Sequence, residues 1–305
     1  MGHPAIRTTG GEGGQFQLKG PQEAFDPRIT PIRGDLADIA LAGRFFAPHY
    51  VVPDIRTCAA VRTMVRGSAS PDARALSELL HGEGFALLDI SRDWAWGYCT
   101  ADGYCGYVPL SALTMTGEQP EPSHIVDARG ALVFAEADIK SRVLRELPMG
   151  ARLAAGEASE CGAFLATGDG YVSRRHVRSL DALDCDPVER AQALAGAPYL
   201  WGGRSGAALD CSGLVQLVMA LAGIDVPRDS DQQLASVGRF LGDDEALKRG
   251  DLVFFPGHVG IMSDGEYLVH ANAHWMQVVT EPLADVIARF PADGGDPVIG
   301  RKRIG

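Results

Sequence analysis

The sequence lacks the features that mark several classes of protein. No uninterrupted apolar run reaches the ~18 residues of a membrane-spanning helix, so we expect no membrane segment. Positive charge is scarce, because 28 Lys and Arg oppose 39 Asp and Glu and leave a formal net charge of −11. A negative surplus opposes binding to nucleic-acid phosphates and to anionic membranes. We therefore expect neither a nucleic acid nor a membrane as a partner.

The amino-terminal residues also lack a targeting signal. They contain no apolar stretch of ~7–15 residues, which a secretory signal would need, and Ile6 stands where the myristoylation pattern requires Ser or Thr. These absences predict a cytoplasmic protein in which the Gly-rich residues 1–22 are a disordered tail.

The six cysteines lack the spacing of a thiolate metal site. No C-x-x-C pair occurs, so a zinc site is not expected. Cys99 and Cys105 flank a predicted hairpin turn and stand close enough to lie across from each other. In a reducing cytoplasm we nevertheless expect them to be free thiols.

Short β-prone segments dominate the first part of the chain. Residues 23–50 show no clear periodicity and are interpreted as an ordered arm that packs on a larger unit. Residues 51–117 contain FALLDI, WAWGYC and GYVPL separated by turn residues, which predicts a small β-barrel. Residues 118–184 repeat this pattern more weakly. The endings GYVPLSAL and GYVSRRHV are alike, which favours a duplicated second barrel.

The pattern changes in the last part of the chain. Asp186 and Pro187 form a helix start signal, and Gly196 ends that helix. A longer helix is predicted for CSGLVQLVMALAG, where apolar residues recur at helical spacing, and a short one for Asp229–Val237. The runs DLVFF, HVGIM, EYLVHAN and MQVVTEPL follow as strands. Residues 185–305 are therefore predicted to be an α+β domain with helices before an antiparallel sheet.

Three residues of this domain carry the predicted chemistry. Cys211 stands at the expected start of the long helix, where the helix dipole and unpaired N–H groups lower a thiol pKa and favour the reactive thiolate. His258 begins one strand and His270 ends the next, so the two histidines are expected to lie close together. One can then pair with the thiol while the other orients it. By residue type alone, an inert buried cysteine and two structural histidines are the alternative.

The motifs around these residues resemble a known family. Residues 199–216 read YLWGGRSGAALDCSGLVQ, and GHVGIM and HAN follow. Together they resemble the NlpC-type cysteine peptidases, papain-like hydrolases of bacterial peptidoglycan peptides, over roughly residues 185–303. The upstream half resembles, more weakly, the paired SH3-like barrels of members that cut free murein peptides. The resemblance implies an α+β fold: a papain-like catalytic domain preceded by two small SH3-like β-barrels.

The resemblance also implies roles for individual residues. Cys211 matches the nucleophile, His258 the base and His270 the polar group that orients the base. Tyr199 matches a tyrosine near the developing oxyanion, where a donor stabilises the transition state. The positions implied for substrate binding are Trp201, Asp210, Ser212, Arg228, Asp229 and Ser230, with Tyr107 and Glu83 of the first barrel as candidates for contacting the substrate's free amine.

Most of these residues also have a plainer structural explanation. Trp201, Gly202 and Gly203 suit a turn with local packing. Asp210 suits a helix cap, and Arg228 suits a surface ion pair. The barrel aromatics that suit a core position are Trp94, Trp96, Tyr104 and Tyr107.

The function implied by the resemblance is cleavage of the bond between γ-D-glutamate and a diamino acid in L-Ala-γ-D-Glu-diaminopimelate. The partner would be a short murein peptide with a free N-terminal L-Ala, met during peptide recycling; the reaction passes through a thioester and needs no cofactor. Three alternatives stay open: a wall-binding module with an inactive hydrolase fold, another amidase or acyltransferase of the papain-like superfamily, and a metal site of one Cys and two His. A serine hydrolase centred on Ser205 is disfavoured, because GRSGA lacks the G-x-S-x-G pattern.

Overall fold

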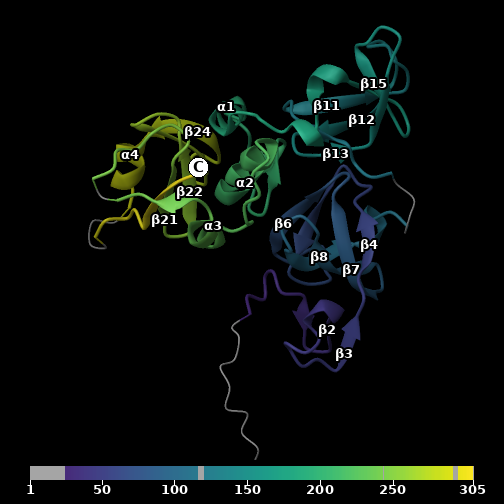
Figure 1. Cartoon of the computed structure of the whole chain (residues 1–305), viewed down its shortest axis with the longest axis horizontal. Coiled ribbons are helices and arrows are strands. Elements are labelled where there is room, and N and C mark those ends of the chain that lie inside the picture. The colour runs from purple at the N-terminus through teal and green to yellow at the C-terminus, as the bar shows by residue number, and fades with distance from the viewer. Residues whose placement is uncertain (1–24, 116–119, 243, 291–294, 305) are drawn as a thin grey trace, which may run out of the picture.

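The structure, a computed structural model, describes residues 25–115, 120–242, 244–290 and 295–304. The tail predicted for residues 1–22 lies outside these ranges. Within them the protein is mostly sheet with few helices. Two β-units lie on one side and the C-terminal domain on the other, as Figure 1 shows. Among the residues described, no helix has the length and apolar character needed to cross a membrane.

The arm forms a small sheet that is anchored on the first β-unit. Its strands are β1 (Ile32–Arg33), β2 (Leu36–Asp38) and β3 (His49–Val51). β2 is central, antiparallel to β1 and parallel to β3. Leu36 packs in a cluster with Leu88, and Asp38 accepts a hydrogen bond from the Tyr98 hydroxyl at 2.8 Å. The arm therefore sits beneath the first unit in the view of Figure 1.

The first β-unit is a six-stranded sheet in the order β4-β7-β8-β9-β5-β6. Its strands are β4 (Asp54–Thr57), β5 (Arg62–Arg66), β6 (Ala75–Leu80), β7 (Gly84–Ser91), β8 (Trp94–Cys99) and β9 (Cys105–Pro109). FALLDI and WAWGYC fall in β7 and β8, and the first four residues of GYVPL fall in β9, which confirms these three strands. Val65, Leu79, Phe85 and Val108 are fully buried and form its core.

The second β-unit divides into two sheets, in the orders β13-β10-β17 and β12-β11-β16-β15-β14. Its strands are β10 (His124–Val126), β11 (Gly130–Phe134), β12 (Val143–Pro148), β13 (Arg152–Leu153), β14 (Ala155–Ala158), β15 (Phe164–Thr167), β16 (Tyr171–Ser173) and β17 (Val177–Ser179). The similar sequences GYVPLSAL and GYVSRRHV adopt the same local structure, a strand followed by a 3-10 turn. β9 runs into a 3-10 turn at Leu110–Ala112, and β16 runs into one at Arg174–His176.

The C-terminal domain packs helices beside a six-stranded antiparallel sheet, in the order β20-β25-β21-β22-β23-β24. The strands are β20 (Arg239–Phe240), β21 (Leu252–Phe255), β22 (His258–Met262), β23 (Tyr267–Asn272), β24 (Gln277–Pro282) and β25 (Gly300–Arg303), with a short hairpin of β18 (Arg204–Ser205) and β19 (Ala208–Leu209). The helices are α1 (Pro187–Ala193), α2 (Cys211–Leu221), α3 (Ser230–Ser236) and α4 (Leu283–Ala288). One core joins Leu214 and Val218 of α2 to Val259 and Val269 of the sheet.

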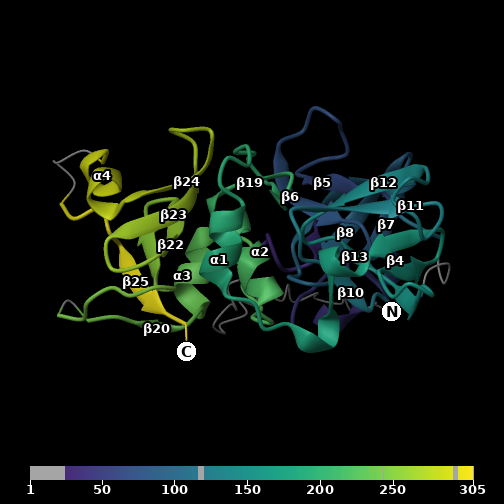
Figure 2. The ribbon, with the colours of Figure 1, turned by 90° about the horizontal axis from the view of Figure 1, so that it is seen from above.

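α2 lies between two parts of the molecule. Figures 1 and 2 both show α2 between the C-terminal sheet and the first β-unit, while α4 lies at the far end of the sheet. β18, which precedes α2, contacts β6 of the first unit. The amino end of α2 therefore faces residues from both parts.

The helix signals read from the sequence are confirmed, with small shifts of the ends. The Asp186 side chain accepts hydrogen bonds from the backbone N–H groups of Val188 and Glu189 at the start of α1. This helix ends at Ala193, three residues before Gly196, which has φ +79°. α3 runs from Ser230 to Ser236, within the predicted range.

Candidate active site

Cys211 is the first residue of α2 and is 7% exposed. The preceding Asp210 caps the helix, and its Oδ1 accepts the Gly213 N–H at 2.8 Å. We expected the helix start to lower the thiol pKa, and this expectation is wrong. Burial raises the pKa of Cys211 to about 11 and the Asp210 carboxylate adds to the rise, while hydrogen bonds from the Val259 and Ser212 backbones oppose it by less.

The two histidines lie in contact on neighbouring strands. His258 Nε2 and His270 Nδ1 are 2.8 Å apart, and the two rings meet edge to face. Burial lowers the pKa of His258 to about 3, and the His270 and Arg289 charges add to the effect. Val259, the next residue along β22, directs its backbone N–H at the Cys211 thiol. The strand thus brings His258 alongside the predicted nucleophile.

A residue absent from the sequence predictions completes this line of side chains. Glu281 of β24 lies 2.8 Å from His270, between Oε1 and Nε2. Its carboxylate also accepts hydrogen bonds from Arg289. Burial opposes the ionisation of Glu281, but the hydrogen bonds from Arg289 and His270 outweigh it and lower its pKa. The line therefore runs from His258 through His270 to an ionised carboxylate.

Two pockets meet at the predicted catalytic residues. One, of about 460 Å³, is lined by Cys211, Tyr199, Trp201, Tyr104, Asp229 and Arg28 among others. The other, of about 350 Å³, is lined by His258, Asn272 and Arg289. Tyr199 and Gly257 line both pockets, so a cleft extends to either side of the thiol and the imidazole. Burial raises the pKa of Tyr199 to about 12, so its hydroxyl keeps the proton it would donate at neutral pH.

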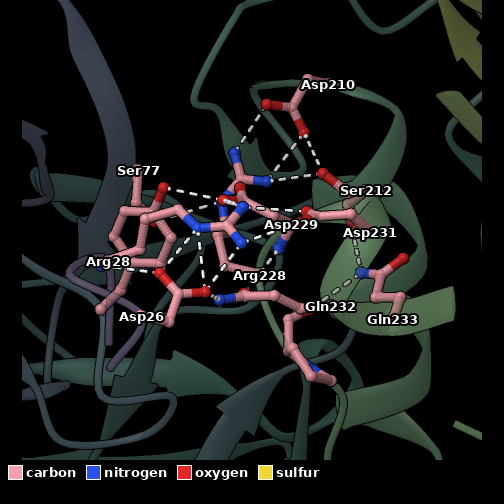
Figure 3. Close-up of polar contacts among 12 residues, drawn as sticks. Asp26, Arg28, Ser77, Asp210, Ser212, Arg228, Asp229, Asp231, Gln232 and Gln233 are labelled. Carbon is pink, nitrogen blue, oxygen red and sulfur yellow. Dashed lines mark hydrogen bonds and ion pairs between the residues drawn. The ribbon is translucent and has the colours of Figure 1, made fainter. Parts of the chain in front are cut away.

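Asp210, Ser212 and Arg228 form a buried cluster under the first pocket. The Arg228 guanidinium, 1% exposed, donates to Asp210 Oδ2 at 2.7 Å and to Ser212 Oγ at 2.9 Å. Figure 3 shows these three side chains converging with Ser77 of the first β-unit. A surface ion pair had been the alternative for Arg228, and the structure contradicts it. Asp210 and Ser212 line the pocket, whereas Arg228 supports them from beneath.

Asp229 faces the pocket and gathers donors from two other parts of the chain. The Tyr104 hydroxyl of the first β-unit donates to Asp229 Oδ2 at 3.0 Å, and Arg28 of the arm donates to the same oxygen at 2.8 Å. Arg28 also pairs with Asp26 and with Asp231, as Figure 3 shows. No local sequence pattern indicates Arg28, because its partners Asp229 and Asp231, at the start of α3, follow about 200 residues later.

The other predicted substrate-binding residues fall in different places. Ser230 and Trp201 line the first pocket, and Trp201 is 52% exposed beneath the Arg74 guanidinium, 4.7 Å from its ring. Glu83 is 3% exposed and accepts a hydrogen bond from Arg204 at 2.7 Å. Tyr107 packs with the arm-facing cluster of the first unit. Neither Glu83 nor Tyr107 is among the residues that line the pocket.

Tyr104 occupies the position that was expected for Tyr107. Tyr104 comes just before β9 and Tyr107 lies within it. The sequence alone does not fix the strand register, so it does not show which of the two tyrosines reaches the pocket. Burial raises the pKa of Tyr104, and the Asp229 carboxylate adds to the rise, so the hydroxyl is a donor. We therefore replace Tyr107 by Tyr104 as the tyrosine that the first β-unit contributes to the site.

Comparison with known proteins decides the family of the site. The NlpC/P60 family profile matches residues 196–288, which contain Cys211, His258, His270 and Glu281. The C-terminal domain is an NlpC/P60 domain. A second profile, described as the bacterial dipeptidyl-peptidase SH3 domain, matches residues 65–113 and so covers most of the first β-unit.

The similarity to known proteins extends beyond the NlpC/P60 domain. The chain is 29% identical over 228 residues to dipeptidyl-peptidase 6 from Lysinibacillus sphaericus, covering 67% of this chain and 83% of the relative. It is 34% identical over 194 residues to the gamma-D-glutamyl-L-lysine dipeptidyl-peptidase of Bacillus subtilis strain 168, covering 55% of this chain and 60% of that relative. These homologues are named peptidases.

A solved structure shares the fold of most of the chain. An NlpC/P60 family protein from Bacillus cereus ATCC 10987 superposes with a TM-score of 0.69 at 19% identity, covering 82% of this chain and 99% of that protein. At this identity the likeness shows the fold alone. Papain-like NlpC/P60 architecture and an SH3 domain are therefore both present.

The site geometry bears on the rival interpretations of the NlpC/P60 domain. Within the described part of the chain, His, Cys, Asp and Glu side chains do not gather in groups of three that could hold a metal ion. Ser205 is fully buried in β18, and its hydroxyl has no hydrogen-bond partner. Ser205 therefore offers no accessible nucleophile, whereas Cys211 lines the first pocket.

Proposed function

We propose that this protein is a cysteine endopeptidase that hydrolyses the bond between γ-D-glutamate and a diamino acid in short murein peptides, such as L-Ala-γ-D-Glu-diaminopimelate. The observation that carries the proposal is the line His258–His270–Glu281 beside Cys211, at the junction of two pockets. Two relatives named gamma-D-glutamyl-L-lysine dipeptidyl-peptidases support this class of bond.

The proposed reaction is acyl transfer with Cys211 as nucleophile. The thiol and the imidazole are both neutral in the free enzyme, so proton transfer from Cys211 Sγ to His258 accompanies attack on the γ-carbonyl carbon. Tyr199 donates a hydrogen bond to the developing oxyanion. His258 then gives the proton to the leaving amine, and a thioester remains. Water attacks the thioester with His258 as base, and the thiol is restored.

The pocket that contains Asp229 suits the amino end of the substrate. Three carboxylates, from Asp26, Asp229 and Asp231, surround the single guanidinium of Arg28, so the group keeps an excess of negative charge. An ammonium placed there gains a charge-assisted hydrogen bond worth roughly 1.5–3 kcal/mol. Asp229 and Ser230 would hold the free amine of L-Ala, with Tyr104 beside them.

The proposal extends to the other units and to the cellular setting. The second β-unit, residues 118–184, is proposed to be a second SH3-like barrel, since its strand and 3-10 turn ending repeats that of the first. We propose a cytoplasmic role in the recycling of murein peptides. The enzyme would then meet short peptides with free amines, which is what the Asp229 pocket accommodates.

Product analysis tests the proposed function directly. Mass spectrometry of L-Ala-γ-D-Glu-diaminopimelate incubated with the protein should detect L-Ala-D-Glu and free diaminopimelate. Cys211→Ala should abolish both products without lowering the thermal midpoint, because the side chain is small and only the thiolate attacks. Removal of the exposed Cys161 by Cys161→Ala is the matched control and should leave turnover unchanged. Wild-type turnover in Cys211→Ala would refute a cysteine mechanism.

A further inference from the structure

Glu281 accepts hydrogen bonds and offers none. Its Oε1 lies 2.8 Å from His270 Nε2. The carboxylate also accepts hydrogen bonds from Arg289 and, at 3.3 Å, from the Trp275 indole N–H. An ionised carboxylate has no proton to donate. A contact of 2.8 Å between it and a ring nitrogen therefore requires that the nitrogen carry the hydrogen. His270 is accordingly protonated on Nε2.

Asn272 cannot reverse this assignment. Its Nδ2 lies 3.2 Å from His270 Nε2 and 3.3 Å from Glu281 Oε1, while its Oδ1 accepts the His274 backbone N–H. The backbone contact fixes the orientation of the amide, so Nδ2 faces the Glu281 carboxylate as a donor. If His270 Nε2 were bare, its lone pair would face the carboxylate oxygen at 2.8 Å, which is repulsive.

The protonation state of His270 determines that of His258. Because His270 holds its hydrogen on Nε2, its Nδ1 can only accept, and the partner 2.8 Å away, His258 Nε2, must donate. His258 Nδ1 is then the bare nitrogen, and in the proposed reaction it takes the Cys211 proton. The opposite arrangement would place a hydrogen on His258 Nδ1 and leave no base for the thiol.

We propose that Glu281 is a positioning residue that fixes the hydrogen positions of both imidazoles and thereby keeps His258 competent as the base for Cys211. Glu281 touches neither the thiol nor the cleft, and it acts through His270, which is fully buried. The charged groups around the pair are Arg289 beside Glu281 and Asp210 toward His258. This inference rests on Cys211 chemistry in the proposed function but not on the identity of the peptide.

Glu281→Gln is the decisive variant. The amide has the same size, but it can donate or accept a hydrogen bond. It can therefore pair with His270 whether the ring hydrogen is on Nε2 or on Nδ1, and the preference for the Nε2–H form is lost. We expect kcat on the murein tripeptide to fall by ~10-fold or more, within the range that general-base groups contribute, with KM little changed. Glu281→Asp, which keeps a carboxylate, should restore part of the loss. Trp275→Phe removes a donor to Glu281 but leaves the His270 contact, and should keep the wild-type kcat.

Nitrogen NMR of histidine-labelled protein tests the inference without any substrate. In the wild type at neutral pH, His258 and His270 should both show the Nε2–H form. In Glu281→Gln, a mixture of the two forms should appear at both rings. Because Glu281→Gln leaves Arg289 underpaired, the double variant Glu281→Gln/Arg289→Gln, which restores charge balance, should show the same mixture.

The two readouts separate this inference from the proposed function. If the wild type shows Nδ1–H at His258, or if both Gln variants keep the pure Nε2–H form, the positioning role of Glu281 is wrong. A pure form in the wild type that is lost in the variants supports the role even if the tripeptide is not cleaved. In that case only the choice of peptide fails.

Discussion

At the scale of single residues, Cys211 and His258 are both uncharged at neutral pH. Burial raises the pKa of the thiol to about 11 and lowers the pKa of the imidazole to about 3. Burial therefore disfavours a thiolate–imidazolium pair in the free enzyme. The substrate must change the local polarity, or the proton must move as the sulfur attacks, before the reactive form appears.

The low pKa of His258 has a measurable effect on stability. In the unfolded chain this histidine binds a proton below about pH 6.5, whereas in the fold it stays neutral down to about pH 3. The unfolded state thus binds more protons across this window, so stability is present above pH 6.5 and is lost as the pH falls toward 3. The variant His258→Gln has no titrating group at this position, so it does not lose stability from this cause as the pH falls. Its amide can still form a hydrogen bond with His270.

Thermal midpoints of wild type and His258→Gln between pH 7 and pH 4 check this expectation. The stability advantage of the wild type over the variant should shrink as the pH falls, by up to ~1.4 kcal/mol per pH unit. Titration of other groups is common to both proteins and cancels in the difference. A difference that stays constant with pH would show that His258 titrates in the fold as it does in the unfolded chain.

At the scale of elements, the start of α2 depends on one buried ion pair. Asp210 caps the helix, accepts the Gly202 N–H at 2.8 Å and pairs with Arg228 through both carboxylate oxygens. Asp210 is 7% exposed and Arg228 1% exposed, so removing either partner leaves a polar or charged group without compensation in the interior. Because Arg228 also donates to Ser77 of β6 at 3.2 Å, the pair links the turn that carries Cys211 to the first β-unit.

A double-mutant cycle tests this dependence. Asp210→Asn keeps a good helix cap but leaves the Arg228 charge unpaired, and should destabilise the protein by about 3–5 kcal/mol. Arg228→Met should cost a similar amount. The double variant should lose clearly less than the sum, since no charge is then left unpaired. Thermal midpoints of the four proteins give the comparison, and simple additivity would mean that the two groups act independently.

The sequence predicted those elements whose signals are local. The Asp186 and Pro187 start of α1 and the apolar spacing of α2 need only neighbouring residues. β25 was missed because GRKR shows no apolar alternation, yet Lys302 within it is 2% exposed and donates to the Val237 carbonyl at 2.8 Å. α4 was missed because it has only six residues directly after Pro282.

The candidate site could be predicted where the residues stand in a motif. Cys211, His258 and His270 do so, and the structure brings the two histidines into contact. Glu281 could not be found, because its contact with His270 depends on the register of β23 and β24. The direction of the Cys211 pKa shift was missed for a related reason. A helix start is visible in the sequence, but the burial that outweighs its dipole is a property of the assembled fold.

At the scale of the whole molecule, three distant segments enclose the end of the first pocket. Arg28 comes from the arm, Tyr104 from the first β-unit and Asp229 from the C-terminal domain. The arm is itself fixed to the first unit by Leu36 and by Asp38. A substrate residue beyond the amine would have to pass this boundary. The proposed function thus predicts that the arm affects which peptides enter the pocket and does not alter the chemistry at Cys211.

The last prediction concerns the discrimination between free and blocked amines. Acetylation of L-Ala-γ-D-Glu-diaminopimelate removes the ammonium charge and adds bulk where Arg28 closes the pocket. We expect the wild-type kcat/KM to fall at least ~10-fold on the acetylated peptide, because each ~1.4 kcal/mol is a factor of ten. Arg28→Ala removes the bulk of the boundary but keeps Asp229, so kcat/KM on the acetylated peptide should rise by about tenfold over wild type, while the free peptide still binds through its ammonium.

Arg33→Ala is the matched control for this arm variant. Arg33 belongs to the same arm, but it pairs with Asp35 and Asp89 and lies over the Trp96 ring at 4.9 Å, and it does not line the pocket. Its loss disturbs the anchoring of the arm to the first unit without opening the boundary at Asp229, so the preference for the free amine should persist. If Arg28→Ala, still folded, discriminated as strongly as wild type, the arm would have no part in specificity. If the wild type cleaved both peptides equally, the proposal that Asp229 binds the substrate amine would be wrong. Acetylation removes the ammonium charge, so kcat/KM must change if a carboxylate pairs with it.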